Sequence, residues 1–260
     1  MASDDIPPPH VPAWLVPLTD ALLQTGGALW TLCYILIIRR CLADKTYAMP
    51  LFALAANIGW EITYGLFIAE QFLEKTAFQV WLAVDVGLVY TLLKFGPREW
   101  THAPAIQRNI GKIFTVLCVA MFGVNLSFAR WWIANDIGIA RGKAYGGVRP
   151  AADTTELGFW SALVSQAVLS VACVAQLLSR WNNRGADVWV WLARTVGTLS
   201  GLYVYYGLRW LYWPEAHEYV GSPFALCLAG IGFAADVVYG VLMAQVHRDG
   251  AKGKIRPKRS

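Results

Sequence analysis

The chain is poor in charge, and it has no cysteine or histidine pattern of the kind that staples a small domain or binds a metal. Charged residues make up 15% of its 260 residues, whereas 57% are hydrophobic. The five cysteines form no Cys-x-x-Cys pair, and the four histidines all fall outside the long apolar runs. A disulfide framework and a zinc site are therefore not indicated. The high share of hydrophobic residues and the low share of charged residues are typical of a helical membrane bundle rather than a soluble domain.

Seven apolar runs predict an all-α, seven-transmembrane helical bundle. Each run is long enough to cross about 30 Å of hydrocarbon at a rise of about 1.5 Å per residue. We expect one integral membrane domain over residues 1–260, with a polar lumenal loop near 134–156 and a basic cytoplasmic tail at 247–260. The runs lie near 15–38, 47–69, 76–95, 110–133, 157–179, 188–212 and 223–246.

The distribution of basic residues predicts the orientation of this bundle. Lys and Arg beside the runs number 15 on one side and 5 on the other. By the positive-inside rule the richer side is cytoplasmic, so the N-terminus faces the lumen or exterior and the C-terminus faces the cytosol. The formal net charge of +5 then reflects topology, and we expect no nucleic-acid partner. We expect a multi-pass membrane protein that is located in the endoplasmic reticulum.

Three acids, Glu61, Asp85 and Asp236, fall near the middle of apolar runs. An ionised Asp at that depth costs roughly 2.5–3.5 kcal/mol, and we expect no Lys or Arg beside these acids to offset it. Desolvation then favours the neutral carboxylic acid, which in an apolar cavity is a proton donor. The alternative is architectural: each acid hydrogen-bonds a neighbouring helix, a contact worth about 0.6 kcal/mol on average.

Helical spacing places further polar and aromatic residues beside two of these acids. Asn57, Glu61 and Tyr64 share one face of the second run and can line one pocket, whereas Trp60 points to another side. Asp236 shares a face of the last run with Tyr239.

The third acid, Asp85, has Trp81 and Tyr90 nearby in sequence. Aromatic faces in the middle of the runs can stabilise a cation by up to about 2 kcal/mol where water is excluded. Buried acids together with aromatic faces favour carbocation chemistry.

Five sequence motifs extend this pattern along most of the chain. They are Asn57-x-x-Trp60-Glu61, Pro97-Arg98-Glu99-Trp100, His102-Ala103-Pro104 with Arg108-Asn109, Leu208-Arg209-Trp210-x-Tyr212-Trp213-Pro214-Glu215-Ala216, and Asp236-x-x-Tyr239-Gly240. With these motifs the chain resembles the small membrane-integral terpene cyclases of fungal meroterpenoid and indole-diterpene pathways. The resemblance covers nearly all seven runs and fades in the first dozen residues, the 134–156 loop and the tail.

The resemblance implies protonation of a terminal epoxide, or less often an alkene, on a prenyl chain carried by a polyketide, aromatic or indole head, followed by ring closure. The two essential acids of the family fall on Glu61 and Asp236, and Asp85 is expected to add polarity to the pocket. Glu61 would donate the proton, while Asp236 would assist or accept the terminal proton; which acid does which stays open. The expected partners are an epoxidised prenylated substrate and membrane lipid, and the sequence specifies no oligomeric partner.

Substrate binding is expected to involve Asn57, Trp60, Tyr64, Trp81, Asp85, Tyr90, Tyr239 and Arg209. Arg209 is also expected to pair with Glu215 at the lumenal rim. The chain lacks Asp-Asp-x-x-Asp and Asp-x-Asp-Asp, the motifs for diphosphate ionisation with magnesium and for soluble protonating cyclases, and it lacks glycine-rich nucleotide motifs. No metal or other cofactor is therefore expected.

Two other classes of membrane protein also place acids within spans. A proton-coupled transporter uses them as proton relays, but it favours inverted repeats and broken helices, and neither is visible in the sequence. A seven-span ligand-binding protein is the second alternative. Within that class a retinal pigment is disfavoured, because the last run contains no Lys for a Schiff base.

Overall fold

Long apolar helices packed side by side form the molecule, as the all-α prediction requires. A computed structural model describes residues 5–69, 72–138, 143–145 and 153–251. The described chain is helical apart from one pair of two-residue strands, β1 (Asp5–Ile6) and β2 (Ala144–Tyr145), which pair antiparallel. This short ladder ties the segment before the first helix to the region of the expected 134–156 loop.

The helical elements follow the apolar runs closely. In chain order they are α1 (Leu15–Asp44), α2 (Leu51–Thr63), the π-helix η1 (Tyr64–Ile68), α3 (Phe72–Glu99), α4 (Pro104–Ala134), α5 (Thr155–Arg180), α6 (Val188–Thr198), the π-helix η2 (Leu199–Val204), α7 (Tyr205–Tyr212), the short α8 (Pro214–His217), the 3-10 turn η3 (Glu218–Gly221) and α9 (Pro223–Ala251).

Within the described residues, six of these helices are long and apolar enough to cross a membrane, with α2 and η1 counted as one. The run predicted at 188–212 has a different character, because a π-helical segment divides it into α6, η2 and α7, which follow one another without a gap. Such segments are uncommon and often mark functional sites.

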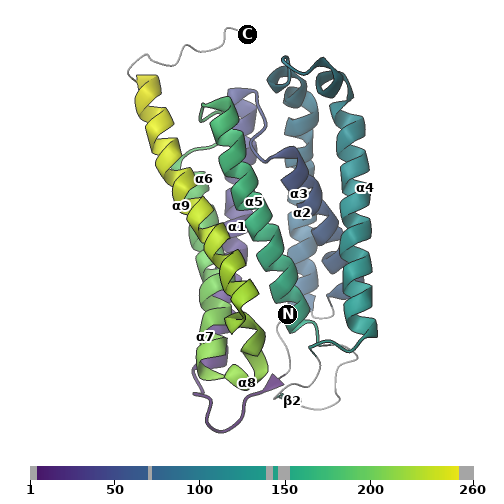
Figure 1. Ribbon diagram of the computed structural model, residues 1–260, viewed down its shortest axis with the longest axis vertical. Helices are drawn as coiled ribbons and strands as arrows, with labels where there is room; N and C mark the ends of the chain where they lie inside the picture. The colour runs from purple at the N-terminus through teal and green to yellow at the C-terminus, as the bar shows by residue number, and fades with distance from the viewer. Residues whose placement is uncertain (1–4, 70–71, 139–142, 146–152, 252–260) are drawn as a thin grey trace.

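Two groups of helices flank α1, as Figure 1 shows. Helices α2, α3 and α4 pack together on one side, and α5, α9 and the α6–α7 rod pack on the other. The rod approaches α1 closely because both carry glycine at the crossing. A Cβ added to Gly26 would lie 2.5 Å from the Cα of Gly201. The glycines therefore set the distance between α1 and the second group.

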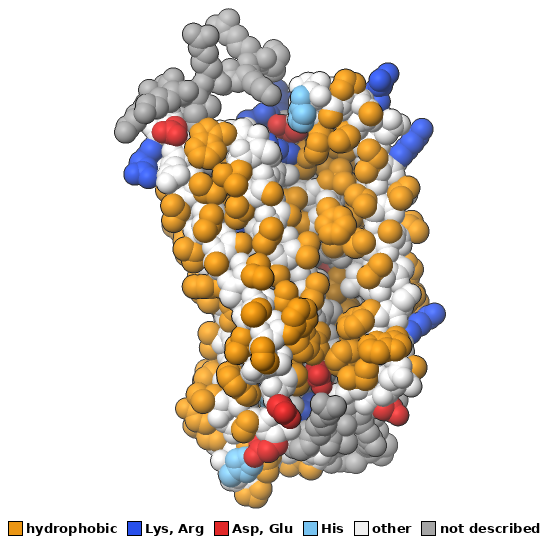
Figure 2. All heavy atoms as spheres, viewed as in Figure 1, with side chains coloured by type: hydrophobic (Ala, Val, Ile, Leu, Met, Phe, Trp, Pro, Cys, Tyr) orange, Lys and Arg blue, Asp and Glu red, His pale blue; other side chains and the backbone are white. Residues whose placement is uncertain are grey.

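The two ends of the bundle are polar and its middle is apolar. Figure 2 shows hydrophobic side chains over the middle of the visible face, with charged side chains mostly toward the two ends. Helix α1 begins at the end where α8 lies, and α9 ends at the opposite end (Figure 1). A bilayer favours this distribution, in which charged side chains lie at the two ends and apolar side chains lie between them.

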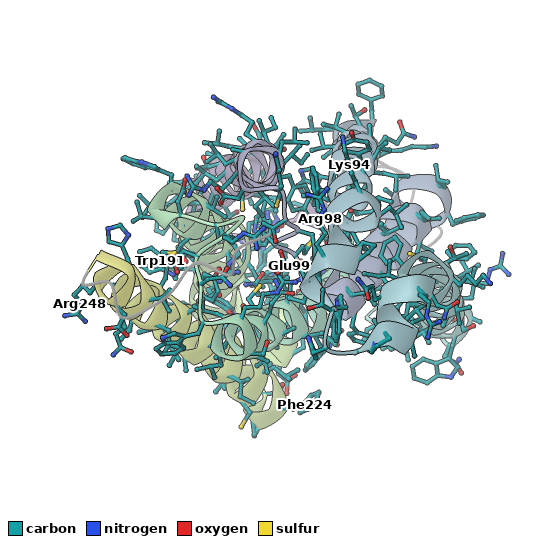
Figure 3. All side chains as sticks on the ribbon, turned by 90° about the horizontal axis from the view of Figure 1, so that it is seen from above. Lys94, Arg98, Glu99, Trp191, Phe224 and Arg248 are labelled. Atoms are coloured by element: carbon teal, nitrogen blue, oxygen red, sulfur yellow. The ribbon has the colours of Figure 1, made fainter. Side chains whose placement is uncertain are left out.

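The Pro97-Arg98-Glu99-Trp100 motif holds helix ends together at the end where α9 finishes. Viewed from that end, Figure 3 shows Glu99 near the centre of the bundle and Arg248 at its periphery. The Glu99 carboxylate accepts a hydrogen bond from the Thr46 hydroxyl at 2.7 Å and pairs with Arg184 at 3.1 Å. Trp100 donates its indole N–H to the Tyr47 hydroxyl at 2.8 Å. The role of this motif is therefore structural.

Candidate active site

A cavity of about 500 Å³ lies between the two groups of helices, bordered by α1, α2, α3, α5 and the α6–η2 rod. Its volume is within the usual range for sites that enclose a small organic molecule. Most of its wall is apolar, and several aromatic rings face it. These rings belong to Trp30, Tyr34, Trp60, Phe78, Trp81 and Tyr206.

Glu61 and Asp85 form one acid cluster on the α2–α3 side. Both are almost completely buried, at 0% and 1% exposed. The Asn57 amide nitrogen donates to Glu61 Oε1 at 2.9 Å and to Asp85 Oδ2 at 3.0 Å, and the Tyr34 hydroxyl donates to Glu61 Oε1 at 3.4 Å. All of these donors are neutral.

The remaining oxygens of the two acids, Glu61 Oε2 and Asp85 Oδ1, have no hydrogen-bond partner within the described part of the chain. Two carboxylates that share one amide in a dry interior repel each other strongly. A proton held on or between them relieves this repulsion and satisfies a buried oxygen.

Asp236 lies in different surroundings on the α6–α9 side. Its Oδ1 accepts a hydrogen bond from Arg194 Nη2 at 2.7 Å, and its Oδ2 accepts one from Gln166 Nε2 at 3.2 Å. The side chains of Arg194 and Asp236 are 6% and 2% exposed, and the guanidinium lies 4.8 Å from the centre of the Tyr239 ring. The expectation that no Lys or Arg accompanies the acids is wrong for Asp236, because a residue of the sixth run reaches the seventh.

Each acid lies one residue behind the cavity wall. Neither Glu61 nor Asp236 lines the cavity itself. Asn57 and Tyr34 form the wall in front of Glu61, and Gln166 forms it in front of Asp236. The two acids therefore lie behind different walls of one cavity, and hydrogen-bonded side chains connect each of them to it.

Among the other predicted residues, Trp60 and Trp81 reach the cavity. Their indole N–H groups donate to Ser161 at 3.0 Å and Thr31 at 2.9 Å, which fixes both rings against the wall. Tyr64 is fully buried and donates its hydroxyl to the Leu157 carbonyl at 3.4 Å. It lies behind the wall as a packing residue.

Tyr90, Tyr239 and Arg209 are not brought to the cavity wall. Tyr90 is 47% exposed on the outer face of α3, beside Lys94. Tyr239 is stacked under Arg194. The Arg209 guanidinium is buried at the far end of the bundle and lies over the Tyr205 ring.

The expected pairing of Arg209 with Glu215 is also wrong. Arg209 bonds to Thr19 and Asp20 at the start of α1, each at 3.1 Å. Glu215 is half exposed and contacts His10 at 3.4 Å instead. The reason is that α7 packs against α1.

Sequence reasoning missed Tyr34, Gln166 and Arg194. All three interrupt apolar runs, so the criterion applied to the acids, a polar group within a predicted span, would have found Gln166 and Arg194. Tyr34 carried a weaker signal, because tyrosine is common in membrane helices and nothing local distinguishes it from a packing residue.

A further buried polar group lies between α7 and α9, outside the spans. His217 is fully buried, and its Nδ1 lies 2.9 Å from the Tyr219 hydroxyl. Burial lowers the pKa of His217 well below its usual range, and the positive charges of Lys143 and Arg209 act in the same direction. The imidazole is therefore neutral in the folded protein.

Comparison with known proteins places the chain in a family. The model of the Pyr4-like transmembrane terpene cyclases matches residues 3–249. The terpene cyclase ascF of Acremonium egyptiacum is 39% identical over 240 residues, which cover 92% of this chain and 86% of that protein. The terpene cyclase dpchB of Colletotrichum higginsianum is 36% identical over 248 residues, covering 94% and 93%.

A third relative, the terpene cyclase atmB of Aspergillus flavus, is 34% identical over 232 residues, covering 89% of this chain and 87% of its own. No solved structure matches the chain. The family match spans α1 to α9 and includes both acid sites. The chain belongs to the Pyr4-like transmembrane terpene cyclases.

Proposed function

We propose that this protein protonates a terminal epoxide, or an alkene, on a prenyl chain joined to a polyketide, aromatic or indole head, and then guides the resulting cation into rings. The observation that carries the proposal is one apolar, aromatic-walled cavity approached from two walls by acids with different partners. Family membership favours a cyclase over a transporter or a ligand-binding receptor.

The difference between the acid sites assigns their roles in this proposal. The Glu61–Asp85 cluster has neutral donors and stores a proton, so it is the proton source, with Tyr34 and Asn57 between it and the substrate. Asp236 is held as a carboxylate by Arg194, so it accepts the proton at the end of the reaction, next to Gln166. Each is a general acid or base acting from a dry, fixed position.

The chemistry balances as an isomerisation. A proton reaches the epoxide oxygen, the carbon–oxygen bond opens, and an alkene electron pair attacks the electron-poor carbon to form a ring bond. Aromatic faces in the wall stabilise the cation by up to about 2 kcal/mol each when water is excluded. The final cation loses a proton, which leaves an alkene and a hydroxyl. In enzyme classes this is a lyase or isomerase reaction, and the proposal needs no metal.

The proposed setting is a single membrane domain of the endoplasmic reticulum with seven spans. In this arrangement the α6–η2–α7 rod is the remaining span, the N-terminus is lumenal and the tail is cytosolic. The distribution of Lys and Arg supports this orientation.

The test is a microsomal assay with an epoxidised farnesyl or geranylgeranyl phenol, which follows epoxide consumption and product identity separately. Glu61→Gln is expected to stop epoxide consumption. Asp236→Asn is expected to consume epoxide slowly and to change the pattern of alkenes and water-quenched alcohols.

Glu218→Gln is the matched control, because this carboxyl is exposed on η3, outside the cavity. It should behave as wild type. Normal ring formation by both Glu61→Gln and Asp236→Asn, at equal protein levels, would refute the assigned sites.

A further inference from the structure

The cavity is elongated along α3, and its two ends differ. Residues on successive turns of this helix line it, from Trp81 through Phe78 and Glu74 to Leu73. At about 1.5 Å per residue this distance is about 12 Å. One end lies beside the Glu61–Asp85 cluster. The other reaches the first turn of α3, where this apolar helix begins.

From its second end as far as Val80, the cavity opens sideways between α1 and α3. Gln24 and Ala28 of α1, and Leu73 and Val80 of α3, line the cavity and are also exposed on the outer surface. Above this opening the two helices are joined by the hydrogen bond from Trp81 to Thr31. We define the opening by these four exposed residues and call it the mouth. Both helices are long and apolar enough to span a bilayer, so in the proposed membrane setting the mouth faces lipid.

Three polar side chains lie at the mouth, among other polar residues spread along the wall. Gln24, Glu74 and Thr76 line the cavity there. Among the described residues that line the cavity, Glu74 carries a carboxyl group. The carboxyls of Glu61 and Asp236 lie behind the cavity wall. A polar head group is costly to move into the aromatic interior, whereas a hydrocarbon tail gains from burial. A substrate that arrives through lipid is therefore cheapest to bind tail first, with its head left at the mouth.

We propose that Glu74 binds the head group of the substrate and selects heads that carry a hydrogen-bond donor, such as a phenolic hydroxyl or an indole N–H. In this pose the prenyl terminus reaches the Asn57–Tyr34 wall, and the head lies between Gln24 and Glu74. The proposal rests on the proposed cyclase function, and it adds a determinant of substrate choice at the opposite end of the cavity from the proton source.

The experiment compares two substrates that differ in the donor alone: an epoxyfarnesyl phenol and its methyl ether. Wild type, Glu74→Gln and Glu74→Leu are assayed on both in microsomes. Glu74→Leu should raise KM for the phenol by about 10- to 100-fold, the loss expected for a hydrogen bond to a charged acceptor. Its kcat and its KM for the ether should stay near wild type. Glu74→Gln, which keeps an acceptor oxygen, should lie between the two.

The matched control is Glu218→Gln, which should leave both substrates unaffected. Equal changes for phenol and ether, or a change confined to kcat, would overturn the role of Glu74 as a head-group determinant. If Glu74→Leu does not accumulate, Glu74→Gln and Gln24→Leu carry the test, and indifference of both to the phenol hydroxyl would refute it. Failure of the cyclase function itself would look different, because wild type would then cyclise neither substrate.

Discussion

The two acid sites of this bundle begin from the same residue chemistry and end in different electrostatic states. Glu61, on the α2–α3 side, is surrounded by the neutral donors Asn57 and Tyr34 and by a second acid, Asp85. Asp236, on the α6–α9 side, lies against the Arg194 guanidinium at 2.7 Å. The neighbours across the helix interface thus give one acid neutral partners and the other a cationic partner.

The comparison also explains how, in the proposed mechanism, one cavity can both donate and accept a proton. In that mechanism an acid with neutral partners carries the proton, whereas an acid that pairs with a guanidinium starts as the carboxylate that can accept one. Because the two groups lie behind different walls, the proposed base cannot take the proton directly from the proposed acid. In this proposal the apolar, aromatic-walled cavity between them holds the cation.

The largest expected effect is on catalysis, at the α2–α3 site. Glu61→Gln keeps the hydrogen bonds and removes the proton, so kcat for epoxide opening should fall by about 10²- to 10⁴-fold. Rapid-quench or steady-state assays with equal amounts of membrane protein measure this. Substrate affinity should persist, and a loss of binding with normal chemistry in the bound complex would contradict the assignment.

The next effect is on stability, at the α6–α9 site. Asp236→Asn leaves Arg194 buried without an anion, which typically costs about 3–5 kcal/mol. Thermal unfolding in detergent should therefore show a much larger drop for Asp236→Asn than for Glu61→Gln. A double variant, Asp236→Asn with Arg194→Met, removes the unpaired charge and should regain part of the loss. Equal drops for the two single variants would erase the distinction between the sites.

A smaller effect separates the two members of the acid cluster. Asp85→Asn keeps a hydrogen-bonding group beside Asn57 and leaves Glu61 able to carry the proton, so kcat should fall by less than about tenfold. Asp85→Leu, which removes all hydrogen bonding, should cost more. If Asp85→Asn is as inactive as Glu61→Gln, Asp85 is the donor and the roles within the cluster are reversed.

Another buried titratable group, His217, extends the comparison to pH. Its folded-state pKa lies below the unfolded value of about 6.5, so its contribution to stability is complete above that value and is lost as the pH falls toward the folded-state pKa. Unfolding midpoints in detergent should decrease between pH 7.5 and 5. His217→Phe should flatten this dependence, and an unchanged slope would show that other groups cause it.

The smallest expected effect is none. Tyr90 was a predicted substrate-binding residue, yet its side chain is 47% exposed on the outer face of α3. Tyr90→Phe should leave KM, kcat and stability within error of wild type. Trp81 lies four residues before Asp85 and lines the cavity, so Trp81→Leu should impair catalysis. The contrast between the two variants tests which face of α3 meets the substrate.

Sequence reasoning located the acids and most of the helices because both signals are local. A run of about 20 apolar residues predicts a helix wherever it folds, and a carboxyl within that run stands out against its neighbours. The contact between Asn57 and Glu61 could be predicted because the two residues lie four positions apart on one helix. By contrast, Asp236 and Tyr239 are three residues apart on one helix, yet Tyr239 does not line the cavity.

Contacts between helices could not be read in the same way. The Arg194–Asp236 pair, the Gln166 contact and the Arg209–Asp20 pair join residues that are 42, 70 and 189 positions apart. Which of these side chains meet depends on how each helix is rotated about its axis and how closely it packs.

The sequence by itself determined the membrane bundle, its family and the depth of the acids, because hydrophobicity and motifs are properties of short segments. Only the tertiary structure decided which acid has a cation as its partner, which side chains stand between the acids and the cavity, and where the cavity opens. Close contacts such as Gly26 against Gly201 set helix rotation and spacing, and a rotation of one helix would give every buried acid a different neighbour.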